Sequence, residues 1–312
     1  MALRQKLLLT AALAVVALAS FLPVHFAVDA EFWNRLMDAG HLPMFGLLAL
    51  VFHFIHPAKR PGSLVHCATS VSLSTLVAAT AELLQPLVGR TESWFDLRNG
   101  VFGAMIAVSG AALSQQRAKK RWRQAHALAA LAIAAFALWP AFSEWRGICW
   151  RHANFPLLGE FESEAELRLW TAQGGSERSA TSIRFTPEQA VQGKNSLAIH
   201  TGAGSWAGVS YSAGDKDWSG FKQLAFDVFD PGEPFVLSVR VDDDGDCSKF
   251  GSRYDNGFPL EKGWNHLAIS LRELEHGPRS RKLNLRAIRR LALFTGANEP
   301  ARSFFLDHVR LE

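Results

Sequence analysis

The chain has 312 residues, of which 48% are hydrophobic and 20% are charged, with a formal net charge of +4. The apolar content excludes an intrinsically disordered chain, and three cysteines in this length exclude a disulfide-dense scaffold. Residues 1–143 contain 12 Lys and Arg against 6 Asp and Glu, whereas residues 144–312 contain 21 and 23. The basic excess therefore lies in short clusters between apolar runs, which argues against a nucleic-acid-binding face. The composition predicts a membrane protein with an appended soluble domain.

Five apolar stretches in the first half are long enough to be transmembrane helices, because about 20 helical residues cross a hydrocarbon core. We predict spans at residues 7–28, 39–58, 61–83, 99–116 and 124–143. The first stretch has an alternative interpretation as a cleaved signal peptide, since Arg4 and Lys6 precede it and Ala-Val-Asp-Ala resembles a cleavage site. Its apolar length exceeds a usual signal core, so we expect a retained span.

The basic residues around these spans predict their orientation. With a cytoplasmic N-terminus, the inside segments hold nine Lys and Arg, whereas the outside loops hold three, Arg35, Arg90 and Arg98. This asymmetry satisfies the positive-inside rule. Five spans would then place everything after residue 143 outside the cytoplasm.

Polar residues gather at the outer ends of the second, third and fourth spans. This group comprises Asp38, His41, Glu82, Gln85, Arg90, Asp96 and Asn99. A spacing of three residues places Asp38 with His41, and Glu82 with Gln85, on one helical face each. Ionisable groups at a membrane boundary are costly when unpaired, so we expect them to pair with one another or to bind a ligand. His41 and Glu82 are the candidates for acid–base chemistry, and a network that only braces the helices is the alternative.

The order of these residues resembles the VanZ-like family of membrane proteins, over roughly residues 10–115. The resemblance is carried by Asp38-x-x-His41-x-x-x-Phe45-Gly46, then Glu82-x-x-Gln85, then Arg90, Ser93, Asp96, Asn99 and Gly103. The family usually has Asn four residues after the Asp, whereas here Gly100 takes that place and Asn99 lies one position earlier. The family is named after an accessory factor in glycopeptide-antibiotic resistance. The resemblance therefore implies a multi-pass protein of the bacterial cytoplasmic (inner) membrane with a link to that response, and it leaves the biochemical activity open.

From about residue 155 the hydrophobic period changes to two, which is typical of β-strands. We predict nine short strands, at residues 167–170, 182–185, 196–201, 208–212, 224–229, 235–241, 264–270, 288–294 and 304–311. A short helix is predicted at 271–275. This pattern predicts an antiparallel all-β sandwich, a jelly roll, over residues 157–312, joined to the α-helical membrane bundle by a linker at 144–156.

Short segments of this half resemble a carbohydrate-binding-module jelly roll of the galactose-binding-like type. They include Leu158-Gly-Glu-Phe-Glu162, Asp217-Trp-Ser-Gly-Phe221, Gly263-Trp-Asn265 and Phe305-Leu-Asp-His-Val-Arg-Leu311. The resemblance implies glycan binding, for which Trp206, Tyr211 and Tyr254 are the candidates to stack on sugar rings.

Two further pairs of residues in the sandwich carry hypotheses. Asp307 has the strand parity of its apolar neighbours, so its carboxylate needs a partner on the buried face. Similar jelly rolls hold a structural Ca²⁺ there with a Glu from the first strand, and the resemblance implies such a site at Glu162 and Asp307. Cys149 and Cys247 are both expected outside the cytoplasm and are candidates for a disulfide, although sequence alone does not show proximity.

Three functions stay open at this point. The favoured one is a non-enzymatic envelope protein that presents an outer-leaflet polar site and an extracytoplasmic glycan-binding domain. The second is a membrane enzyme acting on a lipid-linked or glycolipid substrate with His41 or Glu82 as acid or base, and the third is a structural scaffold. We expect membrane lipids and a cell-wall glycan or lipid-linked saccharide as partners. Because no phosphate loop, dinucleotide fingerprint, nucleophile elbow or zinc motif is found, we expect neither a nucleotide nor a nucleic acid.

Overall fold

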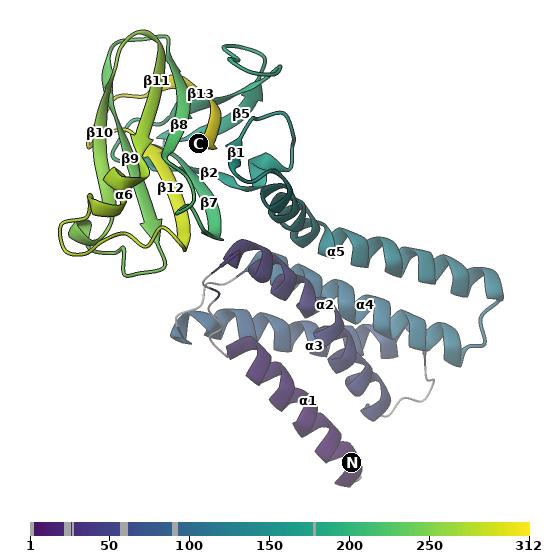
Figure 1. The fold of residues 1–312 in the computed structure, drawn as a ribbon. Helices are drawn as coiled ribbons and strands as arrows, with labels where there is room; N and C mark the ends of the chain where they lie inside the picture. The colour runs from purple at the N-terminus through teal and green to yellow at the C-terminus, as the bar shows by residue number, and fades with distance from the viewer. Residues whose placement is uncertain (1–2, 22–25, 27, 57–61, 89–92, 177–178) are drawn as a thin grey trace. The chain divides into compact units, whose positions relative to one another are not determined.

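The computed structural model describes residues 3–21, 26, 28–56, 62–88, 93–176 and 179–312 (Figure 1). Contacts within the chain divide it into two compact units, Met1–Phe142 and Ser143–Glu312. The first unit is helical and the second is a β-sandwich.

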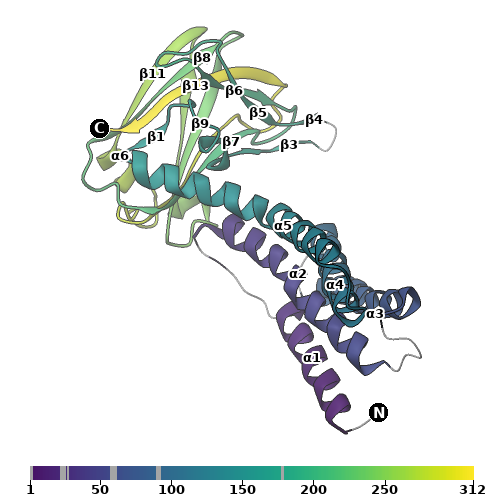
Figure 2. The same ribbon diagram turned by 90° about the vertical axis from the view of Figure 1, so that its right-hand side faces the viewer.

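A helix lies in each of the five predicted spans, of which residues 22–25, 27, 57–58 and 61 lie outside the described parts of the chain. The helices are α1 Leu3–Phe21, α2 Ala30–Ile55, α3 Leu64–Leu84 with the 3₁₀ turn η1 Gln85–Val88, α4 Trp94–Gln115 and α5 Lys120–Asn154. Four of these helices, α2 to α5, are long and apolar enough to cross a membrane, and α1 contains a shorter apolar stretch, Leu7–Val16. Helices α1, α2, α3 and α4 pack against one another (Figure 2).

Serine caps determine where two of the helices begin. Ser63 Oγ accepts a hydrogen bond from the His66 backbone N–H at 3.4 Å, and Ser93 Oγ accepts one from the Asp96 N–H at 3.3 Å. These bonds satisfy N–H groups that have no partner within the helix. Because α4 begins at Trp94, five residues before the predicted span, Asp96 lies in its first turn. A carboxylate is favoured at that end by the helix dipole.

Glycines allow α2 and α4 to approach closely. A Cβ atom at Gly103 would overlap the Leu42 carbonyl oxygen, and one at Gly46 would lie 3.0 Å from the Gly103 oxygen. Small residues at such crossings let two helix backbones come together in a bundle. The result brings the N-terminal half of α2, with His41, beside the first turn of α4.

The second unit contains two antiparallel sheets. The first sheet has the order β11-β8-β13-β6-β5, with β1 paired to β13. Its strands are β1 Leu157–Gly159, β5 Ser182–Thr186, β6 Ser196–Thr201, β8 Gln223–Asp230, β11 Gly263–Ser270 and β13 Arg302–Leu311. The second sheet has the order β10-β9-β12-β7-β2. Its strands are β2 Trp170–Gln173, β7 Gly208–Lys216, β9 Phe235–Asp243, β10 Tyr254–Leu260 and β12 Ile288–Phe294, and a small hairpin pairs β3 Gly175–Ser176 with β4 Ser179–Ala180.

The core of this unit lies between the two sheets and is built by alternation along the strands. On β9, for example, Leu237, Val239 and Val241 are fully buried. Successive side chains point to opposite faces of a strand, so the residues between them face outward. The predicted all-β sandwich is therefore confirmed, and the predicted short helix is present as α6 Leu271–His276.

Two predicted segments differ in the structure. The expected linker at 144–156 is mostly helical, because α5 continues to Asn154 and is held within the second unit. Arg151 is buried there and donates to the Ser212 carbonyl at 3.2 Å, and Gly214 leaves room for its guanidinium group.

The strand predicted at 167–170 is also wrong. Residues Glu166–Arg168 form a 3₁₀ turn and β2 begins at Trp170. The buried Glu166 carboxylate accepts four backbone N–H groups, from residues 160 to 163, at 2.6 to 3.0 Å. These hydrogen bonds curl the chain ahead of β2. An extended strand at 167–170 would move the Glu166 carboxylate away from the N–H groups of residues 160–163. Strand β10, Tyr254–Leu260, is among those that the sequence pattern missed.

Candidate functional site

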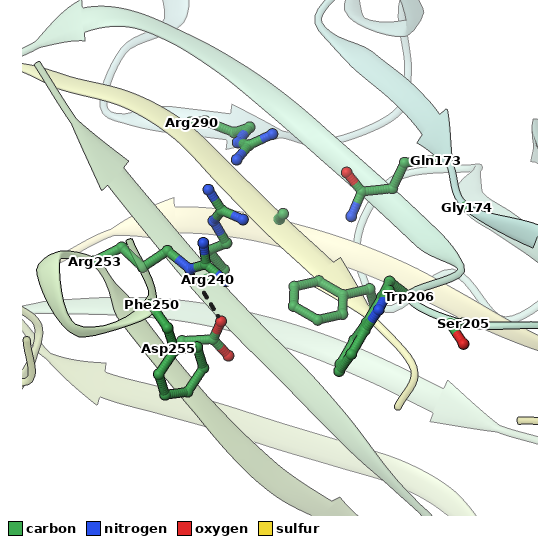
Figure 3. Close-up of a pocket in the computed structure, with 11 residues that line it drawn as sticks. Gln173, Gly174, Ser205, Trp206, Arg240, Phe250, Arg253, Asp255 and Arg290 are labelled. Atoms are coloured by element: carbon green, nitrogen blue, oxygen red, sulfur yellow. Dashed lines mark hydrogen bonds and ion pairs between the residues drawn. The ribbon is translucent and has the colours of Figure 1, made fainter. Parts of the chain in front are cut away.

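The outward face of the second sheet carries a pocket of about 460 Å³ (Figure 3). Strand register explains its floor. Ala292 on β12 pairs with Ser210 on one side and with Arg240 on the other, and Phe294 pairs with Gly208. Small side chains at these central positions leave room above the sheet, while larger ones project from the neighbouring strands.

Two exposed aromatic side chains lie on opposite sides of this pocket (Figure 3). Trp206 is 56% exposed and Phe250 is 57% exposed. Trp206 has a left-handed backbone, with φ of 60°, and its N–H donates to the Gly296 carbonyl at 3.1 Å. Its ring meets Phe294 edge to face, with centroids 6.0 Å apart. The backbone and Phe294 therefore hold the indole in place although much of it faces solvent.

Charged side chains line much of the remaining pocket. Arg240, Arg253, Arg290 and Asp255 line it together with Gln173. The lining therefore has a net positive charge. Each guanidinium group carries five N–H donors in a fork that suits carboxylates and hydroxyl groups.

Buried and half-buried carboxylates orient these arginines. Asp242 accepts from Arg240 Nε at 2.8 Å through Oδ1 and from Arg290 Nε at 2.7 Å through Oδ2. Asp255 accepts from Arg253 Nε at 3.4 Å. Burial raises the pKa of Asp255, although Arg253 partly opposes the shift. The arginines thus lie in fixed positions around the pocket.

Of the three predicted stacking residues, only Trp206 lines the pocket. Tyr211 is buried against Trp170, with ring centroids 5.1 Å apart, and Tyr254 is buried with its hydroxyl donating to Glu273 at 2.6 Å. The prediction is wrong for both tyrosines, because strand alternation turns them into the core. The pocket could have been predicted from the pattern Arg290-x-Ala292-x-Phe294, because these alternate residues share the outward face of β12 and all three line the pocket.

The predicted calcium ligands both hold one loop. Glu162 Oε1 accepts the N–H groups of Lys194 and Asn195 at 2.6 and 2.7 Å. Asp307 Oδ2 accepts those of Val191 and Gln192 at 2.7 and 3.1 Å. The expectation that Asp307 needs a partner on the buried face is thus confirmed. Ca²⁺ requires about six to eight oxygen ligands, whereas this loop offers N–H donors, so the two residues do not fit a calcium site in this arrangement.

The candidate disulfide is not present, because Cys149 and Cys247 are both free thiols. Cys149 is exposed on α5, whereas the Cys247 sulfur lies 3.3 Å from Asp243 Oδ1 and 3.4 Å from Arg281 Nη2. Cys247 therefore belongs to the polar cluster of its own loop.

The helical unit brings together three of the predicted outer-end residues. His41 of α2, Glu82 of α3 and Asp96 of α4 are all buried and lie close enough for their side chains to share one ion. His41 Nδ1 lies 3.5 Å from Asp96 Oδ1. The Ser93 N–H donates to Glu82 Oε2 at 2.8 Å. Of the mutual pairing expected for this group, the described side-chain contacts include the pair of His41 and Asp96.

The other members of that predicted set lie around it. Asn99 donates through Nδ2 to the Asp38 backbone carbonyl at 3.0 Å, while the Asp38 carboxylate lies 3.8 Å from Arg35. Gln85 is fully buried at the end of α3. Arg90 lies outside the described residues.

Comparisons with known proteins bear on the sandwich. No family model matches the chain, and no curated protein matches it. The resemblance of residues 10–115 to VanZ-like proteins therefore stays a prediction.

Among solved structures, the chain is similar to carbohydrate-binding modules. One is a family 11 module from Clostridium thermocellum in complex with a β-1,3-1,4-mixed-linked tetrasaccharide, at 17% identity and a TM-score of 0.41, covering 50% of this chain and 93% of that one. Another is the CBM22-1 xylan-binding domain from Paenibacillus barcinonensis, at 21% identity and a TM-score of 0.32, covering 50% and 94%. A family 30 module of a Clostridium thermocellum cellulase covers 46% and 91%, at 15% identity and a TM-score of 0.37. At these identities the similarity concerns the fold alone, and a ligand has to be inferred from the pocket itself.

Proposed function

We propose that this protein is a membrane-anchored glycan-binding protein whose sandwich binds a saccharide outside the cytoplasm. The observation that carries the proposal is the pocket on the second sheet, with Trp206 and Phe250 exposed on opposite sides of it. Sugar rings have apolar C–H faces that pack on aromatic rings, and hydroxyl edges that need hydrogen-bond partners. Arg240, Arg253 and Gln173 supply such partners between the two aromatic groups.

The charge of the pocket favours an acidic saccharide. Three arginines and Asp255 line it, and Asp242 pairs with two of these arginines, so a net positive charge remains and an anionic group gains more there than a neutral one. Guanidinium groups bind carboxylates through paired, charge-assisted hydrogen bonds. We therefore propose a saccharide that contains uronic acids.

The membrane anchor rests on the first unit. Helices α2 to α5 are long and apolar enough to span a membrane, and the basic residues are distributed as the positive-inside rule requires. With the N-terminus inside, the sandwich would face the extracytoplasmic space. The VanZ-like resemblance supports a bacterial cytoplasmic membrane, which makes envelope polysaccharides the first saccharides to test.

The test is binding of the full-length protein, in detergent or nanodiscs, to a panel of neutral and uronic-acid oligosaccharides by isothermal titration calorimetry. We expect binding that Trp206→Ala weakens at least tenfold, equivalent to about 1.4 kcal/mol. Trp264→Ala is the matched control, because Trp264 is a partly exposed tryptophan on β11 of the other sheet. Its removal should leave the affinity unchanged.

The preference for acidic saccharides is tested by comparing the affinities for uronic-acid and neutral oligosaccharides in the same panel. Uronic-acid oligomers should bind more tightly than neutral ones, and Arg253→Gln should reduce that difference. Equal affinity for both classes would remove the preference for acidic saccharides. No binding to any member of the panel, or the same affinity in wild type, Trp206→Ala and Phe250→Ala, would refute glycan binding at this pocket.

A further inference from the structure

The strongest feature outside the sandwich is the cluster of His41, Glu82 and Asp96. Each residue comes from a different helix and provides one nitrogen or oxygen atom that can bind a metal. These three atoms all lie within 4.8 Å of one another. All three side chains are buried, with residue exposures of 6%, 8% and 3%. Within the described parts of the chain, this is the one group of three such residues that could hold a metal ion.

We propose that His41, Glu82 and Asp96 bind a divalent transition-metal ion, with Zn²⁺ as the ion to test first. One imidazole nitrogen and two carboxylate oxygens form a three-ligand set of the kind that leaves a fourth position of Zn²⁺ open. In a tetrahedral site with bonds of about 2.0–2.1 Å, the ligand atoms lie roughly 3.3 Å apart. The present separations therefore need to contract by about 1.5 Å at most.

Electrostatics favour a cation at this place. Two carboxylates that share a buried site repel each other, and a divalent ion neutralises both.

Surrounding groups already orient the ligands. The Ser93 N–H holds Glu82 Oε2 at 2.8 Å, and His41 Nδ1 lies 3.2 Å from the Met37 carbonyl oxygen. Contacts of this kind with backbone groups fix the rotamer and ring orientation of metal ligands, and they commonly raise affinity for the ion. The close approach of α2 and α4 at Gly103 then fixes the position of His41 relative to Asp96.

A pocket of about 550 Å³ adjoins the cluster and supports a site that a ligand can reach. Glu82 belongs to both, and Ser93 is the other polar group in the pocket lining. Its apolar lining consists of Ala79, Leu83, Pro86, Trp94 and Leu97. Leu83 and Trp94 are largely exposed, so the pocket opens at the apolar surface of the helical unit. An amphiphile could place its chain there and an anionic head group toward the ion.

The experiment is metal analysis of the full-length protein in detergent. After incubation with Zn²⁺ and removal of the unbound ion, mass spectrometry should find one zinc per chain in the wild type. His41→Ala, Glu82→Gln and Asp96→Asn should lose it. His56→Ala and Glu31→Gln are matched controls, because both residues are exposed on or beside α2, and these variants should keep it.

Two further readouts keep the proposal falsifiable if a variant folds poorly. Co²⁺ should give the visible absorption of a tetrahedral site in the wild type, and Zn²⁺ should raise the melting temperature of the wild type but not of Glu82→Gln. A wild type that retains no zinc, shows no Co²⁺ spectrum and melts at the same temperature with Zn²⁺ would overturn the proposal. Zinc retention that is equal in the wild type, Glu82→Gln and Asp96→Asn would do the same.

Arg90 defines the competing arrangement, in which its side chain and not a metal neutralises the carboxylates. In that case Arg90→Ala would lower the melting temperature of the metal-free protein, and the wild type would bind no zinc. If the metal site is correct, Arg90→Ala keeps the zinc. Failure of this proposal leaves glycan binding untouched, since the two sites belong to different units and are tested with different variants.

Discussion

The Asp243 carboxylate at the end of β9 shows how one residue can organise a loop. Arg281 Nη1 and the Asn284 N–H donate to its Oδ2 at 2.5 and 2.6 Å, and the Gly245 N–H donates to Oδ1 at 2.9 Å. Burial alone would raise its pKa, but these hydrogen bonds outweigh that effect and lower the pKa to about 2. The acidic run at 242–246 thus contains two buried anchors, Asp242 and Asp243, followed by the exposed Asp244 and Asp246.

A dependence on pH follows from this lowered pKa. The stabilisation is fully present above the ordinary value of 3.8 and is lost as the pH falls through about 2, because the unfolded state takes up the proton first. Thermal unfolding of the full-length protein, followed by tryptophan fluorescence between pH 2 and 6, should show this loss. In Asp243→Asn the low-pH decline should be smaller and the stability at pH 6 lower.

The control for this measurement is Asp246→Asn. Asp246 is exposed in the same loop, and its hydrogen bonds to Ser248 also lower its pKa, but solvent screens an exposed group, so its replacement should change the profile less than Asp243→Asn does. An Asp243→Asn variant with the pH profile of the wild type would contradict the assignment of Asp243 as the anchor.

At the scale of the elements, the crossing of α2 and α4 determines whether the helical unit can form its polar cluster. Gly103 lies where a Cβ atom would overlap the Leu42 carbonyl oxygen, and the backbone cannot rotate away as a side chain can. Gly103→Ala should therefore destabilise the helical unit by roughly 1–3 kcal/mol, the range found when a packed core is overfilled. Denaturant titration of the purified protein, followed by helical circular dichroism, measures the effect.

Gly40→Ala is the matched control for this substitution. Gly40 lies in α2 as well, but nothing lies within 4 Å of a Cβ built on it. Its replacement should be neutral or stabilising, by up to about 1 kcal/mol, because alanine favours helix more than glycine does. Equal stability of the two variants would mean that the close contact at Gly103 does not constrain the bundle.

The whole molecule is expected to have its N-terminus in the cytoplasm and its sandwich outside. Alkaline phosphatase folds only outside the cytoplasm, so a fusion after Glu312 should be active. A fusion placed after Arg117, in the basic segment between the fourth and fifth predicted spans, should be inactive although it accumulates. An inactive but stable fusion after Glu312 would overturn the five-span topology.

Helix α5 connects the two units, and the length of this helix was missed by the sequence analysis. The apolar run predicted a span that ends at residue 143, yet the helix extends to Asn154. Its last turns contain Arg151, whose buried guanidinium donates to the Ser212 carbonyl. From the sequence, an arginine in a polar stretch is expected to be a solvated linker residue. Its burial is explained only by the Ser212 carbonyl on β7, which accepts its hydrogen bond.

Periodicity along the chain was sufficient to predict the two kinds of architecture. Long apolar runs predicted helices, and the alternation in the second half predicted the strands of a sandwich, because burial of one face imposes a period of its own on each element. The chemistry of single residues was sufficient to predict that the polar cluster would form. A costly polar group in an apolar helix has to find a partner, so His41, Glu82 and Asp96 could be expected to meet.

Contacts between distant strands and helices decided the rest. Tyr211 and Tyr254 have the chemistry of sugar-binding residues, but the strand register turns them into the core, whereas Trp206 and Phe250 flank the pocket. Likewise, Asp307 holds a loop through the backbone N–H groups of Val191 and Gln192, which no local sequence pattern predicts. Sequence by itself determined the class of most elements and which polar residues within apolar stretches need a partner, since both depend on the chemistry and spacing of the residues themselves. The identity of each partner was decided only by the tertiary structure, because it depends on strand register, helix crossing and loop geometry that bring distant segments together.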